Sequence, residues 1–330
     1  MKNILFSFIL LHILTDKAQA QLNIPAPGIV DGVYIKEHVL TKTGPAYEPI
    51  READVVWSKR VWEYIDLREK INQPMYFPLD GYEGTEWVKN SDRWSLWTIL
   101  KTHVLNGDLT LFSPYNPKAY MMRDGDQLKY PVEPLPTKNY YTDLEYKSKL
   151  FSYFGELGPI PTEPLSNNEG GDSVILKKDI SGQDIWELQY PPRDTTWLTS
   201  KDIIQYRMKE DWFIDKERST MDVRIIAIAP VVYSKDTDGQ ITGTKELFWL
   251  YFPHCRFVLN NYYVYNESND SQWMSFDDLF WKRRFTSVVY KESNVADRKI
   301  ETYKSGIDAL YEADKIKEEM RTIEHDVWSF

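Results

Sequence analysis

The stretch that decides the fold is DVRIIAIAPVVY, residues 222–233. Apolar residues, mainly Val, Ile and Ala, occupy consecutive positions in it, which is typical of a strand buried on both faces. An Asp-Thr-Asp-Gly turn follows at 236–239, and residues 246–259 are predicted to return as a second strand. Shorter strands are predicted at 109–112 and 286–292. These segments predict a mixed or antiparallel sheet.

Helices are predicted on the N-terminal side of these strands. Apolar residues recur near helical spacing in residues 55–71, where Asp54 is the candidate N-cap and Pro74 prevents continuation. A second helix is predicted at 93–106, because Gly107 stands where a helix commonly ends. The sheet is therefore expected to carry packed helices, which is the α+β class.

Two further helices have clear start signals. Thr199 and Asp202 form a capping-box pattern ahead of a helix over residues 200–211. Ser275 is the candidate N-cap of a short helix over residues 276–284. The remaining helices are predicted at 144–154 and at 305–325.

Residues 1–20 have the three parts of a secretory signal peptide. Lys2 supplies the positive charge, residues 4–14 the apolar run, and the sequence Ala-Gln-Ala ending at Ala20 the cleavage site. We therefore expect the mature protein to begin at Gln21. No cysteine stands at this site for lipid attachment, and no later apolar stretch is long enough to span a membrane.

Residues 21–53 are predicted to form an extended arm. Four prolines and three glycines between residues 25 and 49 oppose a regular helix or a central strand. Such an arm is expected either to be disordered or to lie on a neighbouring subunit. Residues 54–330 are predicted to form a single α+β domain, with a possible subdivision in the Pro-, Ser- and Asn-rich stretch near 156–172.

Composition excludes some partners and favours others. The chain has 40 basic and 50 acidic residues, a net charge of −10, which argues against nucleic acid and anionic lipid as general partners. Its single cysteine, Cys255, excludes an intramolecular disulfide. The 12 Trp and 22 Tyr are side chains that protein–protein interfaces favour, although an aromatic core explains them equally well.

The sequence lacks the common catalytic signatures HExxH, GxSxG, GxGxxG and CxxC. Residues 239–245 are similar to a phosphate loop but are one residue short and lie in a predicted hairpin. The acidic turn at 236–239 is similar to the start of a calcium-binding loop, but no acidic residue stands at the twelfth position. His254 and Cys255 are adjacent on a predicted strand, so they are expected to point to opposite faces. Cys255 is predicted to be buried. We therefore predict no catalytic residue, metal or cofactor.

The last predicted helix carries a candidate interaction seam. Apolar residues recur there at alternating four- and three-residue steps, as in a heptad repeat. The candidate interaction residues are Ile316, Met320, Ile323 and Val327. The alternative is that this stripe packs against its own domain.

Several blocks resemble the gliding-motility protein family GldN, called PorN in non-gliding relatives. The first is DVVWSKRVWEYIDLREKINQPMYFP at residues 54–78. Further blocks, in the family's order, are KEDWFIDKER at 209–218, RIIAIAP at 224–230, SFDDLFWKRRF at 275–285, YKESN at 290–294 and EHDVW at 324–328. The resemblance spans roughly residues 30–330.

This resemblance implies a structural protein of the type IX secretion and gliding machinery of Bacteroidota. It implies a periplasmic protein that assembles into rings with a GldK/PorK-like lipoprotein beneath the outer membrane. It also implies coupling to the inner-membrane motor formed by GldL and GldM, through the periplasmic part of a GldM/PorM-like protein. The family carries over no catalytic residue.

Two alternative functions predict different surfaces. A periplasmic hydrolase would need a deep pocket in which His254, Asp222 and Glu246 converge. A carbohydrate-binding module would need two or three coplanar aromatic side chains exposed on one strand face. Flat aromatic faces would instead favour a scaffold.

Overall fold

The computed structural model describes residues 44, 46–84, 86–118, 124–134, 143–157, 174–178, 184–188, 195–236, 240–266, 269 and 274–328. The chain divides into two units, Met1–Leu40 and Thr41–Phe330, and all the described residues belong to the second. The predicted signal peptide, its cleavage site between Ala20 and Gln21, and the predicted arm as far as residue 43 lie outside the described residues. Most of the predicted boundary at 156–172 does so too.

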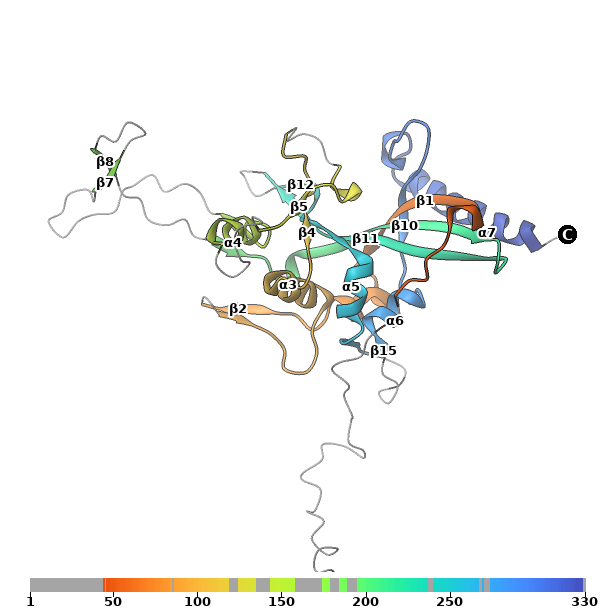
Figure 1. Cartoon of the computed structure of the whole chain (residues 1–330), viewed down its shortest axis with the longest axis horizontal. Coiled ribbons are helices and arrows are strands. Elements are labelled where there is room, and N and C mark those ends of the chain that lie inside the picture. The colour runs from red at the N-terminus through yellow and green to blue at the C-terminus, as the bar shows by residue number, and fades with distance from the viewer. Residues whose placement is uncertain are drawn as a thin grey trace, which may run out of the picture. The chain divides into compact units, whose positions relative to one another are not determined.

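An antiparallel sheet of eight strands forms the framework of the second unit (Figure 1). Its longest strands lie side by side and are β1 (Val55–Asp66), β10 (Ile203–Asp215) and β11 (Thr220–Lys235). The strand order is β16-β1-β10-β11-β13-β4-β5, and β12 also pairs with β11. The shorter members are β16 (Val288–Glu292), β13 (Trp249–Tyr251), β4 (Leu111–Phe112), β5 (Pro131–Val132) and β12 (Ile241–Glu246). The sheet confirms the predicted α+β class in its antiparallel form.

Strand β11 contains the stretch from which the sheet was predicted. Ala227, Ile228, Ala229 and Val231 each have 0% of their surface exposed. Because successive side chains of a strand point to opposite faces, both faces of β11 are covered here. The prediction of a doubly buried strand is confirmed.

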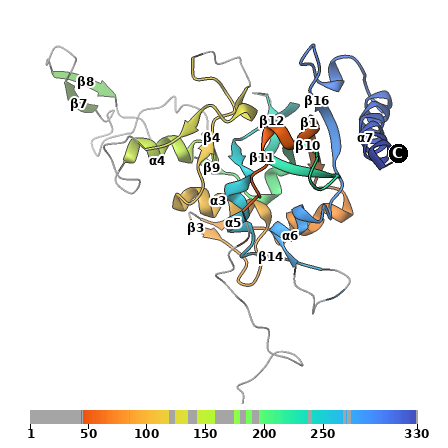
Figure 2. The ribbon, with the colours of Figure 1, turned by 45° about the vertical axis from the view of Figure 1, so that its right-hand side comes forward.

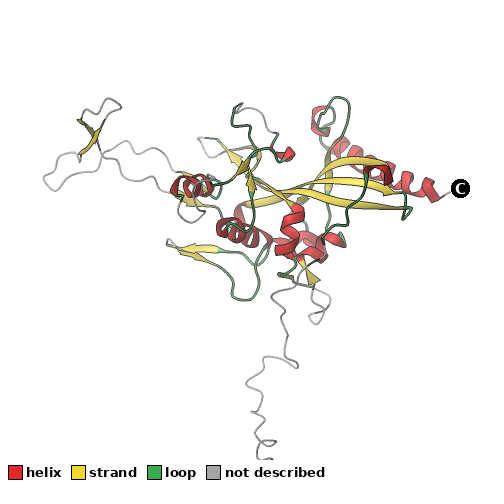
Figure 3. Cartoon of the chain, viewed as in Figure 1, coloured by secondary structure: helices red, strands yellow, loops and turns green. Residues whose placement is uncertain are grey.

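Four predicted helices are confirmed, with ends close to their start and stop signals. They are α3 (Leu96–Asn106), α4 (Leu144–Phe151), α6 (Phe276–Trp281) and α7 (Ile307–Trp328). Ser275 caps α6 because its hydroxyl accepts a hydrogen bond from the Asp278 amide at 3.0 Å. Gly107 ends α3 with φ of 86°, a left-handed conformation that glycine adopts without steric cost. In the view of Figures 1 and 3, α3, α5 (Phe252–Leu259) and α6 lie below the long strands.

Two apolar clusters pack against the sheet. The larger cluster joins α3, α5 and α6 to β10 and β11, and contains Ile65 of β1. The smaller cluster joins α7 to β1 and β16 and contains Val61 of β1; Figure 2 shows α7 beside β16. Val61 and Ile65 are four residues apart, so they lie on the same face of β1. The two clusters therefore occupy neighbouring parts of one sheet face.

Residues 55–71, predicted to be helical, instead form β1 and a short turn, so this prediction is wrong. The apolar positions Trp57, Val61 and Ile65 recur every four residues. A spacing of four falls on one face of a strand as well as near one face of a helix, so it does not separate the two. The surrounding β-branched and aromatic residues favour the strand.

Residues 200–211, the second wrong helix, belong mostly to β10. The capping box of Thr199 and Asp202 does form, but it caps only the single 3₁₀ turn η4 (Ser200–Asp202). Ile203 then starts the strand. The start signal was therefore correct, and the length of the element was not.

Residues 246–259, predicted as one returning strand, contain two elements. These elements are β13, which pairs with β11, and α5, which follows β13 at once. The strand β12, which also pairs with β11, ends at Glu246. Pro253 stands in the first turn of α5, where a proline needs no hydrogen-bond donor. His254 and Cys255 therefore lie on a helix, so their predicted placement on a strand is wrong.

Small elements complete the described part of the chain. Four antiparallel pairs are β2 (Gly81–Glu83) with β3 (Glu86–Val88), β6 (Gly155–Leu157) with β9 (Thr195–Trp197), β7 (Val174–Lys178) with β8 (Asp184–Leu188), and β14 (Tyr263–Val264) with β15 (Met274–Ser275). One-turn helices are α2 (Gln73–Tyr76), η1 (Glu52–Asp54), η2 (Lys70–Asn72), η3 (Gly125–Gln127) and η5 (Ile300–Thr302). Within the described ranges, no helix combines the length and apolar character needed to cross a membrane.

Candidate functional site

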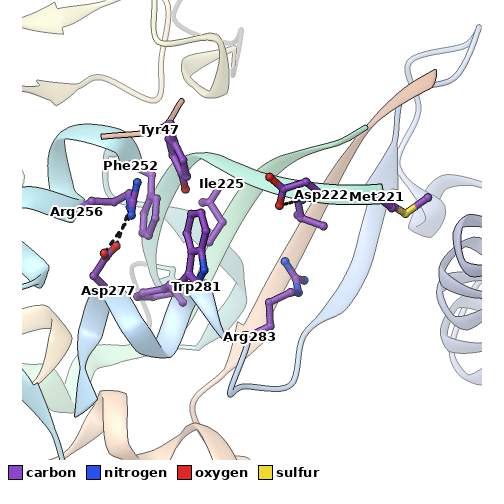
Figure 4. A pocket seen from close by; sticks show the side chains of 11 residues that line it. Tyr47, Met221, Asp222, Ile225, Phe252, Arg256, Asp277, Trp281 and Arg283 are labelled. Carbon is purple, nitrogen blue, oxygen red and sulfur yellow. Dashed lines mark hydrogen bonds and ion pairs between the residues drawn. The ribbon is translucent and has the colours of Figure 1, made fainter. Parts of the chain in front are cut away.

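A pocket of about 180 Å³ opens where α5, α6, β11 and the segment before β1 meet (Figure 4). The segment before β1 supplies Tyr47, and β11 supplies Asp222. α5 supplies Arg256, and α6 supplies Asp277 from its first turn and Trp281 from its last residue. The Ser275 cap thus sets the start of the helix that places two of these side chains.

A buried ion pair fixes the two helices at the pocket. Arg256 Nε donates to Asp277 Oδ1 at 2.8 Å, and Arg256 Nη2 donates to Asp277 Oδ2 at 3.2 Å. The two residues are only 5% and 7% exposed. A bidentate pair of this kind constrains both position and orientation, so it holds α5 against α6.

Aromatic rings cover the ion pair. The rings of Tyr47 and Trp281 stack with centroids 6.0 Å apart and an interplanar angle of 27°. The guanidinium carbon of Arg256 lies 4.2 Å from the Tyr47 ring centroid and 5.1 Å from that of Trp281. Burial raises the pKa of the Tyr47 hydroxyl to about 12, so this hydroxyl is neutral at physiological pH. Trp281 nevertheless remains 57% exposed.

The segment that carries Tyr47 is attached to its own chain at two further points. Glu48 forms an ion pair with Arg218, and Arg51 Nη2 lies 3.3 Å from Glu217 Oε1. Glu217 and Arg218 both lie in the turn between β10 and β11. The last part of the predicted arm, from residue 46 on, therefore contacts the chain's own sheet, and the extended arm over residues 21–53 as a whole stays a prediction.

A second charged group lies inside the protein, between the two apolar clusters. Glu63 of β1 and Glu210 of β10 are both 0% exposed. Arg283 Nη1 donates to both Glu210 carboxylate oxygens at 2.9 Å, and its Nη2 donates to Glu63 Oε2 at 3.1 Å. Lys317 of α7 lies 3.6 Å from Glu63 Oε1. Burial and the neighbouring Glu63 carboxylate raise the pKa of Glu210 to about 7.

The residues expected to converge in a hydrolase do not do so. Asp222 lines the pocket, but Glu246 forms an ion pair with Arg207. His254 lies exposed on α5, with its ring edge-on to Tyr251. Within the described ranges, no three His, Cys, Asp or Glu side chains are grouped closely enough to hold a metal ion.

Cys255 is buried, as predicted. Its side chain is 0% exposed in the larger apolar cluster, and burial raises the pKa of its thiol to about 12. A thiol with so high a pKa is a poor nucleophile at physiological pH. Its surroundings are therefore those of a structural residue.

The predicted seam on α7 faces the chain's own sheet for part of its length. Ile316 and Met320 are 3% and 1% exposed and pack in the smaller apolar cluster with Val289 of β16. Ile323 is half-buried, and the side chain of Val327 lies outside what the structure describes. An intermolecular role for Ile316, Met320, Ile323 and Val327 stays a prediction.

Sequence reasoning missed the ring-covered ion pair and the buried carboxylates. Nothing local links Tyr47 to Trp281, because they come from opposite ends of the chain. The carboxylates did leave a signal. Glu63 stands between Val61 and Ile65 on one strand face, so a correct strand assignment would have marked it as a charge on an apolar face.

The model of the family described as gliding motility associated protein GldN matches residues 50–329. The chain belongs to the GldN family. The match runs from the segment before β1 to the end of α7, so it includes every residue named at the pocket except Tyr47. GldN membership also agrees with the resemblance seen in the sequence blocks. No protein of curated function matches the chain.

Proposed function

We propose that this GldN-family chain is a structural component of the type IX protein secretion and gliding machinery and not an enzyme. In the periplasm it assembles into a ring with a GldK-like lipoprotein at the inner face of the outer membrane. The ring is coupled to the inner-membrane motor through a GldM-like periplasmic domain. The observation that carries the proposal is the GldN family match over residues 50–329.

The chemistry of the pocket supports a scaffold. Arg256 is held by Asp277, and Arg283 is held by Glu210 and Glu63, so these charges already stabilise the fold. The exposed ring of Trp281 lies beside them, and Trp, Tyr and Arg are the residue types that dominate binding energy at protein interfaces. This combination suits recognition of another protein.

The carbohydrate-binding alternative has no comparable support. It requires coplanar exposed aromatic side chains on one strand face. Within the described ranges, the large exposed aromatic side chains lie on helices or in loops, and they are Phe77, Phe151, Phe257, Tyr265, Trp281 and Tyr311.

The proposal is tested by purifying a tagged chain from outer-membrane fractions and imaging the eluate by electron microscopy. Rings that contain this chain and a lipoprotein, identified by mass spectrometry, are the expected result. Deleting the gene should also abolish export of the machinery's substrates. A chain recovered only as a free monomer, from cells in which its deletion leaves export unchanged, would refute the proposal.

A further inference from the structure

We propose that the pocket beside Trp281 receives one basic side chain, an arginine or a lysine, from a partner protein. This inference deepens the proposed function and rests on it for the partner's place in the machinery. It specifies what the partner must present to the pocket.

Among the charged side chains that line the pocket, one carboxylate has no cation partner in the described part of the chain. Arg256 is paired with Asp277, and Arg283 with the two buried glutamates. Asp222 forms no ion pair within the described residues, and its Oδ1 accepts only the Val223 amide, at 2.8 Å. A half-buried carboxylate of this kind is stabilised by an arriving cation.

Arg224 also has no carboxylate partner among the described residues, but its guanidinium lies against aromatic rings outside the pocket lining. The Arg224 guanidinium carbon lies 5.1 Å from the Tyr47 ring centroid and 5.4 Å from that of Phe213. Arg224 is not among the residues that line the pocket, and no ion pair joins it to Asp222. Among the charged residues that line the pocket, Asp222 is therefore the one with no ion pair to a described residue.

The Trp281 ring at the pocket also favours a cation. Figure 4 shows the Trp281 ring just below Tyr47, with Asp222 to the right of both. Tryptophan is the strongest cation–π partner among the side chains, and this ring is 57% exposed. Apolar surface from Phe252 and Ile225 lines the same pocket and can cover the aliphatic stem of an arginine or lysine.

The size of the pocket selects a side chain over a metabolite. Small-molecule sites usually measure about 300–1,000 Å³. This pocket, at about 180 Å³, is smaller than that range. An apolar side chain would fit the volume but would cover Asp222 without pairing it, which is unfavourable, and an acidic one would be repelled.

The test uses the protein labelled with 5-fluorotryptophan, with the Trp281 fluorine signal assigned by comparison with Trp281→Phe. The probe is the peptide acetyl-Gly-Arg-Gly-amide, and its control is the same peptide with citrulline, which keeps the shape and removes the charge. We expect a saturable shift of the Trp281 signal with the arginine peptide and little shift with the citrulline peptide. Equal responses to the two peptides, or a response to acetyl-Gly-Glu-Gly-amide instead, would overturn the inference.

Two variants test whether the Asp222 carboxylate binds the basic side chain. Asp222→Asn should weaken arginine-peptide binding by about tenfold or more, since a hydrogen bond to a charged group is lost. The matched control is Asp308→Asn on the exposed first turn of α7, which removes the same charge far from the pocket and should leave binding unchanged. Equal binding by both variants would count against the proposal. If Asp222→Asn fails to fold, the comparison of the arginine and citrulline peptides on the unsubstituted protein still tests the proposal.

The two proposals fail separately. Peptide binding is measured on the isolated protein, whereas ring formation is measured on material from cells. Absent peptide binding with intact rings would overturn the inference alone, and absent rings with intact peptide binding would overturn the proposed function alone.

Discussion

Replacing Arg283 with methionine removes the guanidinium that Glu63 and Glu210 share inside the protein. Both carboxylates are fully buried, and three hydrogen bonds of 2.9 to 3.1 Å join them to Arg283. Removing one member of a buried ion pair typically costs about 3–5 kcal/mol, because the remaining charge stays desolvated. We expect a loss of that size in the free energy of unfolding at about pH 8, above the pKa of about 7 that Glu210 has in the folded protein. Since domains are typically stable by about 5–15 kcal/mol, the variant should still fold.

The assay is urea unfolding of the isolated protein, followed by circular dichroism and tryptophan fluorescence. The matched control is Arg284→Met, which changes the neighbouring exposed arginine in the same way. The loss caused by Arg283→Met should shrink as the pH falls, because protonation neutralises the Glu210 carboxylate that loses its only arginine partner. A loss at about pH 8 no larger than that of Arg284→Met, or a loss that grows on acidification, would refute the reasoning.

Further outcomes follow from single residues. Because the folded protein raises the pKa of Glu210 from 4.5 to about 7, its proton contributes stability that is fully present below pH 4.5 and is lost as the pH rises through about 7. Glu210→Gln should therefore remove that part of the pH dependence, measured as the unfolding free energy between these limits; an unchanged pH profile would contradict it. Ile316→Glu should reduce folded protein in cells and in thermal melts, whereas Leu310→Glu, at an exposed position of the same helix, should not. Cys255→Ser should cost about 1–3 kcal/mol in urea unfolding without stopping export. N-terminal sequencing of the exported protein should begin at Gln21, and an intact leader would disprove cleavage there.

The parts of the fold that the sequence predicts are those with a local cause. Gly107 ends α3 by its own backbone freedom, and Ser275 starts α6 through its own hydroxyl. The consecutive apolar residues of β11 predict burial on both faces wherever the strand lies in the sheet. Each of these signals acts over a few residues and needs no knowledge of the rest of the chain.

The parts that sequence reasoning missed depend on distant contacts or on a periodicity with two meanings. Trp57, Val61 and Ile65 satisfy helical and extended spacing alike, and the pairing of β1 with β10 and β16 decides between them. The pocket requires Tyr47 and Trp281 to meet across most of the chain, and no local pattern records such a meeting.

The long pairing of β1 with β10 gives the chain a preferred direction of mechanical resistance. The two strands are paired from Val55 opposite Asp215 to Asp66 opposite Gln205. Antiparallel hydrogen bonds run perpendicular to the strands, so tension applied along β1 from the residues before it stretches the whole ladder in shear. Tension applied across the strands would instead open the ladder one bond at a time. The Lys216 amide donates to the Asp54 carbonyl at 2.9 Å just before this ladder, so a lengthwise pull is shared between the two strands from the entry of β1.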